Sequence, residues 1–202
     1  MNIEEHPIIK TFEGLIAFSQ ESATDMSECG KALHANPKSM FLRRVCVRTF
    51  AAHVEGLIYL MKQVALELHP VMKVDFTVGE VTFLKEKSFE LNEKGEVIEK
   101  RKLLRFIDNF KFTCASFSRA NRSSFRIKYD DDGFNYFKEV IKIRDRLMHP
   151  KSKSDLHISD EETKSARKAW DWYQQQFAEM LGDCMSSFEA YAKTLKDKAK
   201  TK

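Results

Sequence analysis

Hydrophobic residues recur every three to four positions along most of the chain, which predicts long amphipathic helices. The pattern is clearest between Ser39 and Pro70, where the apolar positions form one continuous stripe: Val47, Phe50, Val54, Leu57, Ile58, Met61 and Val64. A helix of roughly 30 residues is about 45 Å long. Such a length suits a helical bundle, or a dimer built on long helices.

Four further segments show helical periodicity. Helices are expected over about residues 8–20 and 101–118, between the acidic run DDDG and the pair His149-Pro150, and from the sequence SDEE onward. Ser159 and Glu162 have the spacing of a capping box, which would begin the last helix. Its aromatic stripe is expected to lie in the core or in a dimer interface. The polar stretch 24–37 is expected to be helical only in part.

Residues 75–100 lose this periodicity and contain the turn signal Asn-Glu-Lys-Gly. This pattern predicts a short helix followed by a hairpin, inserted between bundle helices. The expected fold class is therefore all-α, with long antiparallel helices. We expect a single helical domain over residues 1–202, with the insertion at about 75–100 and a flexible basic tail at about 195–202.

Composition narrows the class of protein. Hydrophobic residues make up 43% of the chain and charged residues 32%, which is typical of a globular protein. With 7 Gly and 4 Pro, a turn-rich β-sandwich is disfavoured. No apolar run reaches the roughly 20 residues needed to cross a bilayer, and the first residues lack a signal-peptide pattern. The four cysteines are far apart, so free thiols in the cytoplasm are expected, without a metal site.

The stretch VIKIRDRLMHP carries the most specific chemistry. Pro150 disfavours α geometry at the preceding residue, which places His149 just outside a helix C-terminus. Asp145, four residues earlier, could accept a hydrogen bond from one ring nitrogen and leave the other for proton transfer. Arg144 has a planar guanidinium suited to a phosphate. Positions five apart diverge by about 140° in a straight helix, so Arg144 and His149 can converge only because the helix ends.

The same spacing occurs between Arg48 and His53, but inside a continuous helix, where the two side chains should point apart. Basic residues are also favoured at helix C-termini by the helix dipole alone. Asp145 could simply form a surface ion pair. The residues by themselves therefore leave two interpretations of this stretch open, a helix cap or an active site.

The segment IRDRLMHP resembles the signature of HEPN domains, in which an arginine and a polar residue precede a histidine near the end of a late helix. RTFAAHVEGLIYLMKQVA resembles their long earlier helix, which often carries a glutamate. FELNEKGEVIEKRKLLRFIDNFKF is similar to the inserted segment of abortive-infection-type members. The resemblance covers most of the chain from about Ser39 to Tyr191. It implies a HEPN-like helical bundle that acts as a metal-independent endoribonuclease without a cofactor.

The resemblance also implies site residues and partners. Arg144, Asp145 and His149 match the catalytic positions of the motif, and Arg146, Lys151 and Lys153 are expected to bind the RNA substrate. Such enzymes are usually homodimers in which the two motifs share one cleft. A dimer would supply two histidines, one as acid and one as base. The expected role is that of a toxin or antiphage effector, with a possible antitoxin or defence-system partner.

Several alternatives stay open. A loop with four basic residues could follow an RNA backbone or merely be solvated; these residues are Arg119, Arg122, Arg126 and Lys128. Glu55 could pair with a basic residue near the cleft or face solvent, and the second is favoured. His53 is expected to be a partly buried structural residue. A rival hypothesis is a non-catalytic HEPN-like module that binds RNA, a nucleotide or a protein, and a third is a purely structural dimer subunit.

Overall fold

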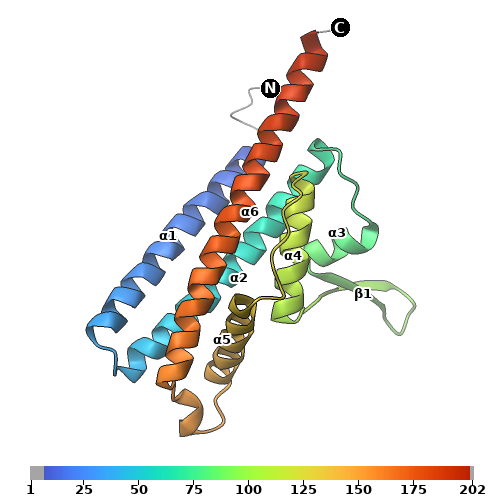
Figure 1. Cartoon of the computed structure of the whole chain (residues 1–202). Helices are drawn as coiled ribbons and strands as arrows, with labels where there is room; N and C mark the ends of the chain where they lie inside the picture. Colours follow the sequence, from blue (N-terminus) through green and yellow to red (C-terminus); the bar gives the residue numbers. More distant parts are fainter. Residues whose placement is uncertain (1–6, 201–202) are drawn as a thin grey trace. The chain divides into compact units, whose positions relative to one another are not determined.

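The computed structural model describes the backbone of residues 7–200 and the side chains of residues 9–191, 193 and 194. The chain is all-α, as the periodicity predicted, with 74% of its residues helical. The described elements are α1 (Pro7–Ala35), α2 (Met40–Val71), α3 (Val78–Leu84), β1 (Lys87–Leu91), β2 (Val97–Arg101), α4 (Phe106–Ala120), α5 (Asp132–Met148), the 3-10 helix η2 (Lys153–Leu156) and α6 (Asp160–Lys200) (Figure 1).

The contacts divide the described residues into two compact units. The first unit contains residues 7–12, 58–126 and 180–200, and the second contains residues 13–57 and 127–179. Helices α1, α2 and α6 contribute residues to both. In the described part of the chain, no helix has a stretch long and apolar enough to cross a membrane. The tail expected at 195–202 is described only by its backbone as far as Lys200, which is helical.

The second unit is held together by aromatic rings from three helices. Phe50 of α2 contacts Phe137 of α5 edge-on, with ring centroids 5.9 Å apart. Tyr173 of α6 stacks on Phe137, and Trp172 also packs against it. Gly133 lies beneath the Trp172 ring, where a β-carbon would come within 2.1 Å of it. Burial of these large rings fixes α5 against the N-terminal halves of α2 and α6 (Figure 1).

Helix α1 is much longer than the expected segment 8–20, since it continues to Ala35. The polar stretch 24–37 was wrongly expected to be helical only in part. Its half-buried positions, Met26, Cys29 and Leu33, keep helical spacing, but the many polar residues between them weaken the hydrophobic pattern. The Ser22 hydroxyl lies 2.7 Å from His53 Nδ1, and the Cys46 thiol donates to the carbonyl of Cys29 over 3.3 Å. These contacts with α2 add to the burial of the apolar side chains.

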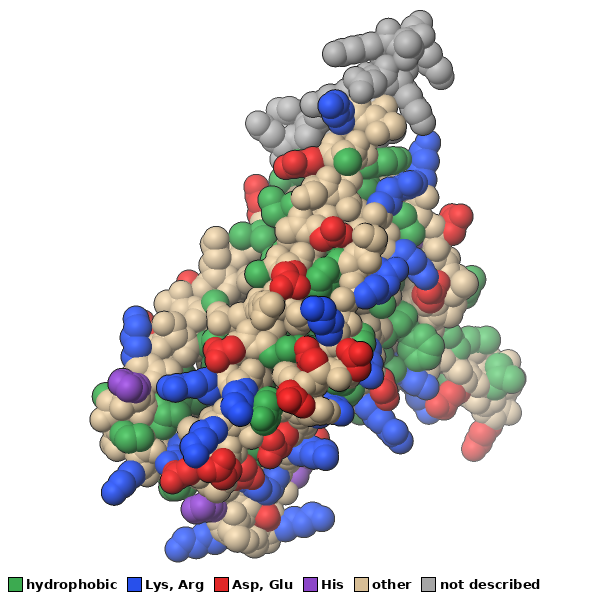
Figure 2. Space-filling view, viewed as in Figure 1, with side chains coloured by type: hydrophobic (Ala, Val, Ile, Leu, Met, Phe, Trp, Pro, Cys, Tyr) green, Lys and Arg blue, Asp and Glu red, His purple; other side chains and the backbone are tan. Residues whose placement is uncertain are grey.

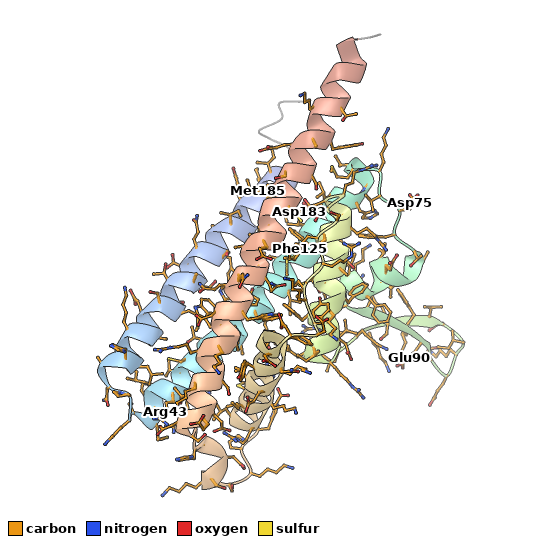
Figure 3. All side chains as sticks on the ribbon, viewed as in Figure 1. Arg43, Asp75, Glu90, Phe125, Asp183 and Met185 are labelled. Atoms are coloured by element: carbon orange, nitrogen blue, oxygen red, sulfur yellow. The ribbon has the colours of Figure 1, made fainter. Side chains whose placement is uncertain are left out.

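Helix α2 and the start of α6 agree closely with the expectations. Helix α2 covers Met40–Val71, and every residue of its predicted apolar stripe is buried. The expected capping box of α6 is present, because Ser159 N–H donates to the Glu162 carboxylate and Glu162 N–H donates to Ser159 Oγ. Arg43 of α2, labelled in Figure 3, joins these elements by donating to the carbonyl oxygens of Pro37 and Ile158 and by pairing with Asp160.

The first unit contains the predicted insertion. It consists of the short helix α3 and an antiparallel hairpin in which Lys87 pairs with Arg101 and Leu91 pairs with Val97. The expectation of a short helix and a hairpin is confirmed. Helix α4 begins at Phe106 rather than at residue 101, because β2 occupies residues 97–101. The hairpin extends away from α4 (Figure 1).

A buried lysine fixes the base of this hairpin. Lys62 of α2 is fully buried, and its ammonium group lies 3.1 Å from the Glu86 carboxylate. Burial lowers the pKa of Lys62, and the partner Glu86 only partly offsets this. Arg101 of β2 pairs with the same carboxylate at 3.1 Å. One carboxylate thus anchors both strands to the helix core of the first unit.

Candidate active site

The end of α5 has the geometry that Pro150 predicts. The helix ends at Met148, and His149 leaves it with φ −129° and ψ 58°. The His149 N–H still donates to the carbonyl of Asp145, over 3.1 Å. Its imidazole is exposed and makes no hydrogen bond with any described residue. The prediction that His149 stands outside the helix is therefore confirmed, and both ring nitrogens remain open to a ligand.

Arg144 is held by two carboxylates. One Nη forms a close ion pair with Glu55 of α2, and the other lies 3.0 Å from Asp145 Oδ1. Glu55 was expected to face solvent without a partner, and this is wrong, because α5 packs beside α2 and brings Arg144 to Glu55. The Glu55 side chain is nevertheless 45% exposed, and that of Arg144 is 22% exposed. Solvent screening keeps the energy of such a pair on the order of 0–1 kcal/mol.

Asp145 does not take the position expected for it. Its carboxylate contacts the Arg144 guanidinium instead of the His149 ring, and the Asp145–His149 hydrogen bond is between backbone groups. The reason is local, because His149 has left the helix and no longer sits one turn above Asp145 in regular geometry. In this structure Asp145 therefore acts on the neighbouring arginine, and the described residues offer the imidazole no carboxylate partner.

Arg146 is engaged by the protein. Its Nε and Nη2 donate to the carbonyl oxygens of Asp155 and His157, over 3.1 and 2.8 Å. Its Nη1 lies 2.9 Å from Glu162 at the start of α6. Burial by itself raises the pKa of Glu162. Hydrogen bonds from Arg146 and Ser159 lower it by more than burial raises it, so the pKa lies below its usual value. These contacts indicate that Arg146 fixes the α5–α6 loop, and its expected role in substrate binding stays a prediction.

The loop after His149 is held in shape by the side chain of Asp155. Its carboxylate accepts hydrogen bonds from the N–H groups of Lys151 and Ser152, each over 2.8 Å. The first of these bonds is the main reason that the pKa of Asp155 lies below its usual value. The Lys151 and Lys153 side chains are exposed and pair with no described residue. Both lysines expected to bind substrate thus stay available at this end of the second unit, where basic side chains and carboxylates alternate (Figure 2).

Two arginines of α2 also reach this region. Arg48 Nη2 donates to the carbonyl oxygen of Leu147 over 3.2 Å, at the C-terminus of α5. Arg44 Nη1 donates to the carbonyl oxygen of Leu156 in η2 over 3.1 Å. Neither arginine was predicted from the sequence to belong to the site. A signal was present, because Arg44, Arg48 and Glu55 are spaced by four and seven residues and so share one face of the helix.

Arg48 and His53 of α2, which have the same spacing as Arg144 and His149, point apart as predicted. Arg48 is exposed and contacts α5, whereas His53 is 4% exposed and lies between Ser22, Trp170 and Tyr173. The Ser22 hydroxyl donates to the carbonyl of Phe18 over 2.6 Å, so it accepts from a protonated His53 Nδ1. Burial lowers the pKa of His53 to about 4. His53 is therefore neutral and structural, and its side chain points away from Arg48.

Two of the four basic residues in the loop, Arg119 and Arg122, are held by contacts with the protein, whereas Arg126 and Lys128 are exposed. Arg119 pairs with Glu80 at 2.7 Å and stacks over Phe76, with the guanidinium carbon 4.3 Å from the ring centroid. Arg122 donates to the carbonyl oxygens of Met72 and Lys73 beyond the end of α2. Ser123 and the N–H of Phe125 bond to Asp183 of α6, and the last two residues are labelled in Figure 3. These contacts favour the structural interpretation for Arg119 and Arg122.

Comparisons with protein-family models, curated proteins and solved structures find no match to this chain. The assignment of chemistry therefore rests on residues and geometry. Among the described residues, no group of three or more His, Cys, Asp or Glu side chains is arranged to hold a metal ion. The end of α5 carries an exposed imidazole at His149, with the exposed Lys151 and Lys153 shortly after it in the chain and Arg48 bound to the carbonyl of Leu147 shortly before it. Imidazole and cationic side chains are groups used for acid–base chemistry on a phosphodiester.

Proposed function

We propose that this protein is a HEPN-type, metal-independent endoribonuclease that cleaves RNA through the RNA's own 2′-hydroxyl group. The observation that carries the proposal is the exposed His149, which leaves α5 just before Pro150, two residues after the Leu147 carbonyl that accepts a hydrogen bond from Arg48. Imidazole is the side chain that enzymes use most often as a general acid or base. The resemblance of IRDRLMHP to the HEPN motif supplies the reaction class.

In the proposed reaction, one imidazole removes the proton from the 2′-hydroxyl, and the resulting oxygen attacks the adjacent phosphorus. The bond from phosphorus to the 5′-oxygen breaks, and that oxygen takes a proton from an imidazolium. The products are a 2′,3′-cyclic phosphate and a 5′-hydroxyl. Arginine side chains stabilise the charge that develops on the phosphorane oxygens. Lys151 and Lys153, both exposed, hold the flanking phosphates.

One chain supplies a single histidine to this site, whereas the reaction uses a base and an acid. A homodimer that brings two copies of His149 to one cleft provides both, and we include this dimer in the proposal. Cleavage of cellular or phage RNA by such an enzyme stops growth of the host, which fits a toxin or antiphage effector. An antitoxin or defence-system partner would then control it.

The test is cleavage of single-stranded RNA by the purified protein in excess EDTA. We expect products that end in 2′,3′-cyclic phosphate, and a loss of about 10³-fold in rate for His149→Ala. His157→Ala is the matched control, since this second exposed histidine lies in the same loop and should leave the rate unchanged. Cleavage that survives His149→Ala, or that ends in a different terminus, contradicts the mechanism.

One observation favours a second candidate, a non-catalytic module that binds RNA, a nucleotide or a protein. Arg144 is paired with two carboxylates, Glu55 and Asp145, as expected of a residue that stabilises the helix contact. Under this candidate the protein binds RNA without cutting it, and His149→Ala changes neither binding nor stability. The product analysis above separates the two functions.

A further inference from the structure

We propose that Arg48 is a phosphate-binding residue of this site, and that it contacts an RNA phosphate before Arg144 does. The inference deepens the proposed function and rests on it for the identity of the ligand. Nothing in the motif itself points to Arg48, because it lies on α2, nearly one hundred residues before the IRDRLMHP segment. Its assignment comes from the contact that it makes.

That contact places the guanidinium next to the motif. Arg48 Nη2 donates to the carbonyl oxygen of Leu147, two residues before His149. Consecutive Cα atoms are about 3.8 Å apart, so the backbone of His149 lies within about 7.6 Å of that of Leu147. The side chain of an arginine anchored at Leu147 therefore lies within reach of a phosphate that is bound at the imidazole.

The two arginines differ in what their donors already contact. A guanidinium carries five N–H groups, and Arg48 uses one of them on the carbonyl oxygen. The others make no hydrogen bond with a described residue, and the side chain is exposed. The guanidinium of Arg144 is instead shared between Glu55 and Asp145 and is mostly buried. In the ligand-free protein, an incoming anion thus meets an uncompensated charge at Arg48 and a compensated one at Arg144.

A simpler role for Arg48 is to cap α5, since cations are favoured at a helix C-terminus. Capping explains one hydrogen bond but uses only part of the side chain. Arg122 shows what a purely capping arginine looks like in this protein. Its Nε and one Nη both donate to the carbonyl oxygens of Met72 and Lys73, and its guanidinium stacks over Tyr191. Arg48 lacks these additional contacts with described residues, which is the basis for distinguishing it from a cap.

The experiment measures binding of a single-stranded RNA oligonucleotide carrying 2′-O-methyl groups, which cannot be cleaved through the 2′ oxygen. Dissociation constants of the full-length wild type and of Arg48→Gln, Arg48→Lys and Arg122→Gln are compared over a series of salt concentrations. We expect Arg48→Gln to weaken binding about fivefold at 0.1 M salt and to reduce the slope of log K against log salt by about 0.7. Arg48→Lys keeps the charge and should keep the slope.

Arg122→Gln also removes one positive charge, from an arginine that likewise donates to backbone carbonyls beyond a helix end. It should leave the slope of log K against log salt unchanged. Melting temperatures confirm that each variant is folded under the binding conditions. The inference is overturned if Arg48→Gln binds with the wild-type affinity and slope, or if Arg122→Gln loses as much as Arg48→Gln. The inference is also overturned if Arg48→Lys reduces the slope of log K against log salt as much as Arg48→Gln does, because lysine keeps the positive charge that sets this slope.

The outcome is separable from that of the proposed function. If the wild type cleaves ordinary RNA but Arg48→Gln binds normally, the nuclease assignment stands and the role of Arg48 fails. If the wild type does not cleave but Arg48→Gln weakens binding, the phosphate site stands and the nuclease assignment fails. A wild type that binds no RNA overturns both.

Discussion

The chain contains two arginine–histidine pairs with identical spacing, Arg48–His53 and Arg144–His149, and they have opposite environments. In α2 the helix continues through the pair, and His53 is buried among aromatic rings and held by Ser22. In α5 the helix ends at Met148, between Arg144 and His149, and the His149 imidazole is exposed and makes no hydrogen bond with a described residue. The arginines differ in the reverse sense, because Arg48 is open and Arg144 is enclosed by carboxylates.

The comparison teaches that spacing alone does not define a site. Five residues correspond to a rotation of about 500° along a helix, so a continuous helix sends the two side chains to different faces. A proline one residue after the histidine removes that constraint. The contact from Arg48 to Leu147 places the open arginine of one pair at a backbone position two residues before the open histidine of the other. The proposed use of Arg48 together with His149 therefore combines one residue from each pair.

The largest expected effect concerns the buried histidine. The folded pKa of His53 is about 4, well below the unfolded value near 6.5, so the unfolded state binds a proton more readily. Its contribution to stability is complete above pH 6.5 and is lost as pH falls toward 4, by about 3 kcal/mol. His53→Phe keeps the ring volume and leaves Ser22 bonded to the Phe18 carbonyl. Relative to this variant, the wild type should lose that amount in urea unfolding between pH 6.5 and 4.

His149→Ala is the control for removing a histidine, since its imidazole is exposed and makes no hydrogen bond with a described residue. A wild type and His53→Phe with parallel pH profiles would contradict the assignment of His53 as a neutral, buried residue. Other groups that titrate in this range are the same in both proteins, so the difference between the two profiles isolates the imidazole.

The next effect tests the proline stop. Pro150→Ala allows α geometry at His149, and α5 can then add residues to its C-terminus, as α2 does around His53. We expect the Cα chemical shift of His149 to move toward helical values and RNA cleavage to fall by about 10²-fold, because the imidazole is displaced. Pro70→Ala, in the last turn of α2, is the matched control and should change neither quantity. Unchanged shifts in Pro150→Ala would mean that Asp155 and the loop, rather than the proline, position His149.

Local features of this site were predictable from the sequence, whereas its long-range contacts were not. The end of α5 follows from one proline, and the start of α6 follows from Ser159 and Glu162. Both are set within a few residues. The pairing of Glu55 with Arg144 joins positions 89 residues apart, and the contacts of Arg146 depend on the path of the α5–α6 loop. No periodicity encodes such contacts, because they depend on which helices become neighbours.

The same distinction explains α1. Its apolar pattern thins after residue 20, where Ser22 and Cys29 add specific contacts with α2 to the burial of Met26 and Leu33. Polar contacts of this kind need a neighbouring helix to be in place before they stabilise anything. Hydrophobic stripes, by contrast, mark an inward face whatever the partner, and this is why α2 was predicted almost to the residue.

The smallest expected effect would make Arg144 resemble Arg48. Glu55→Gln removes one of the two carboxylates at Arg144 and keeps the side-chain size, so the guanidinium becomes available to an anion and one negative charge near the RNA is lost. We expect affinity for uncleavable single-stranded RNA to rise about threefold at 0.1 M salt, in line with the modest energy of an exposed ion pair. Glu139→Gln, an exposed glutamate elsewhere on α5, controls for the change in net charge. If affinity falls instead, Glu55 must orient Arg144 toward the phosphate, and the carboxylate would be a positioning residue of the site. The direction of this small change in affinity therefore decides whether Glu55 blocks Arg144 from binding a phosphate or orients it for binding.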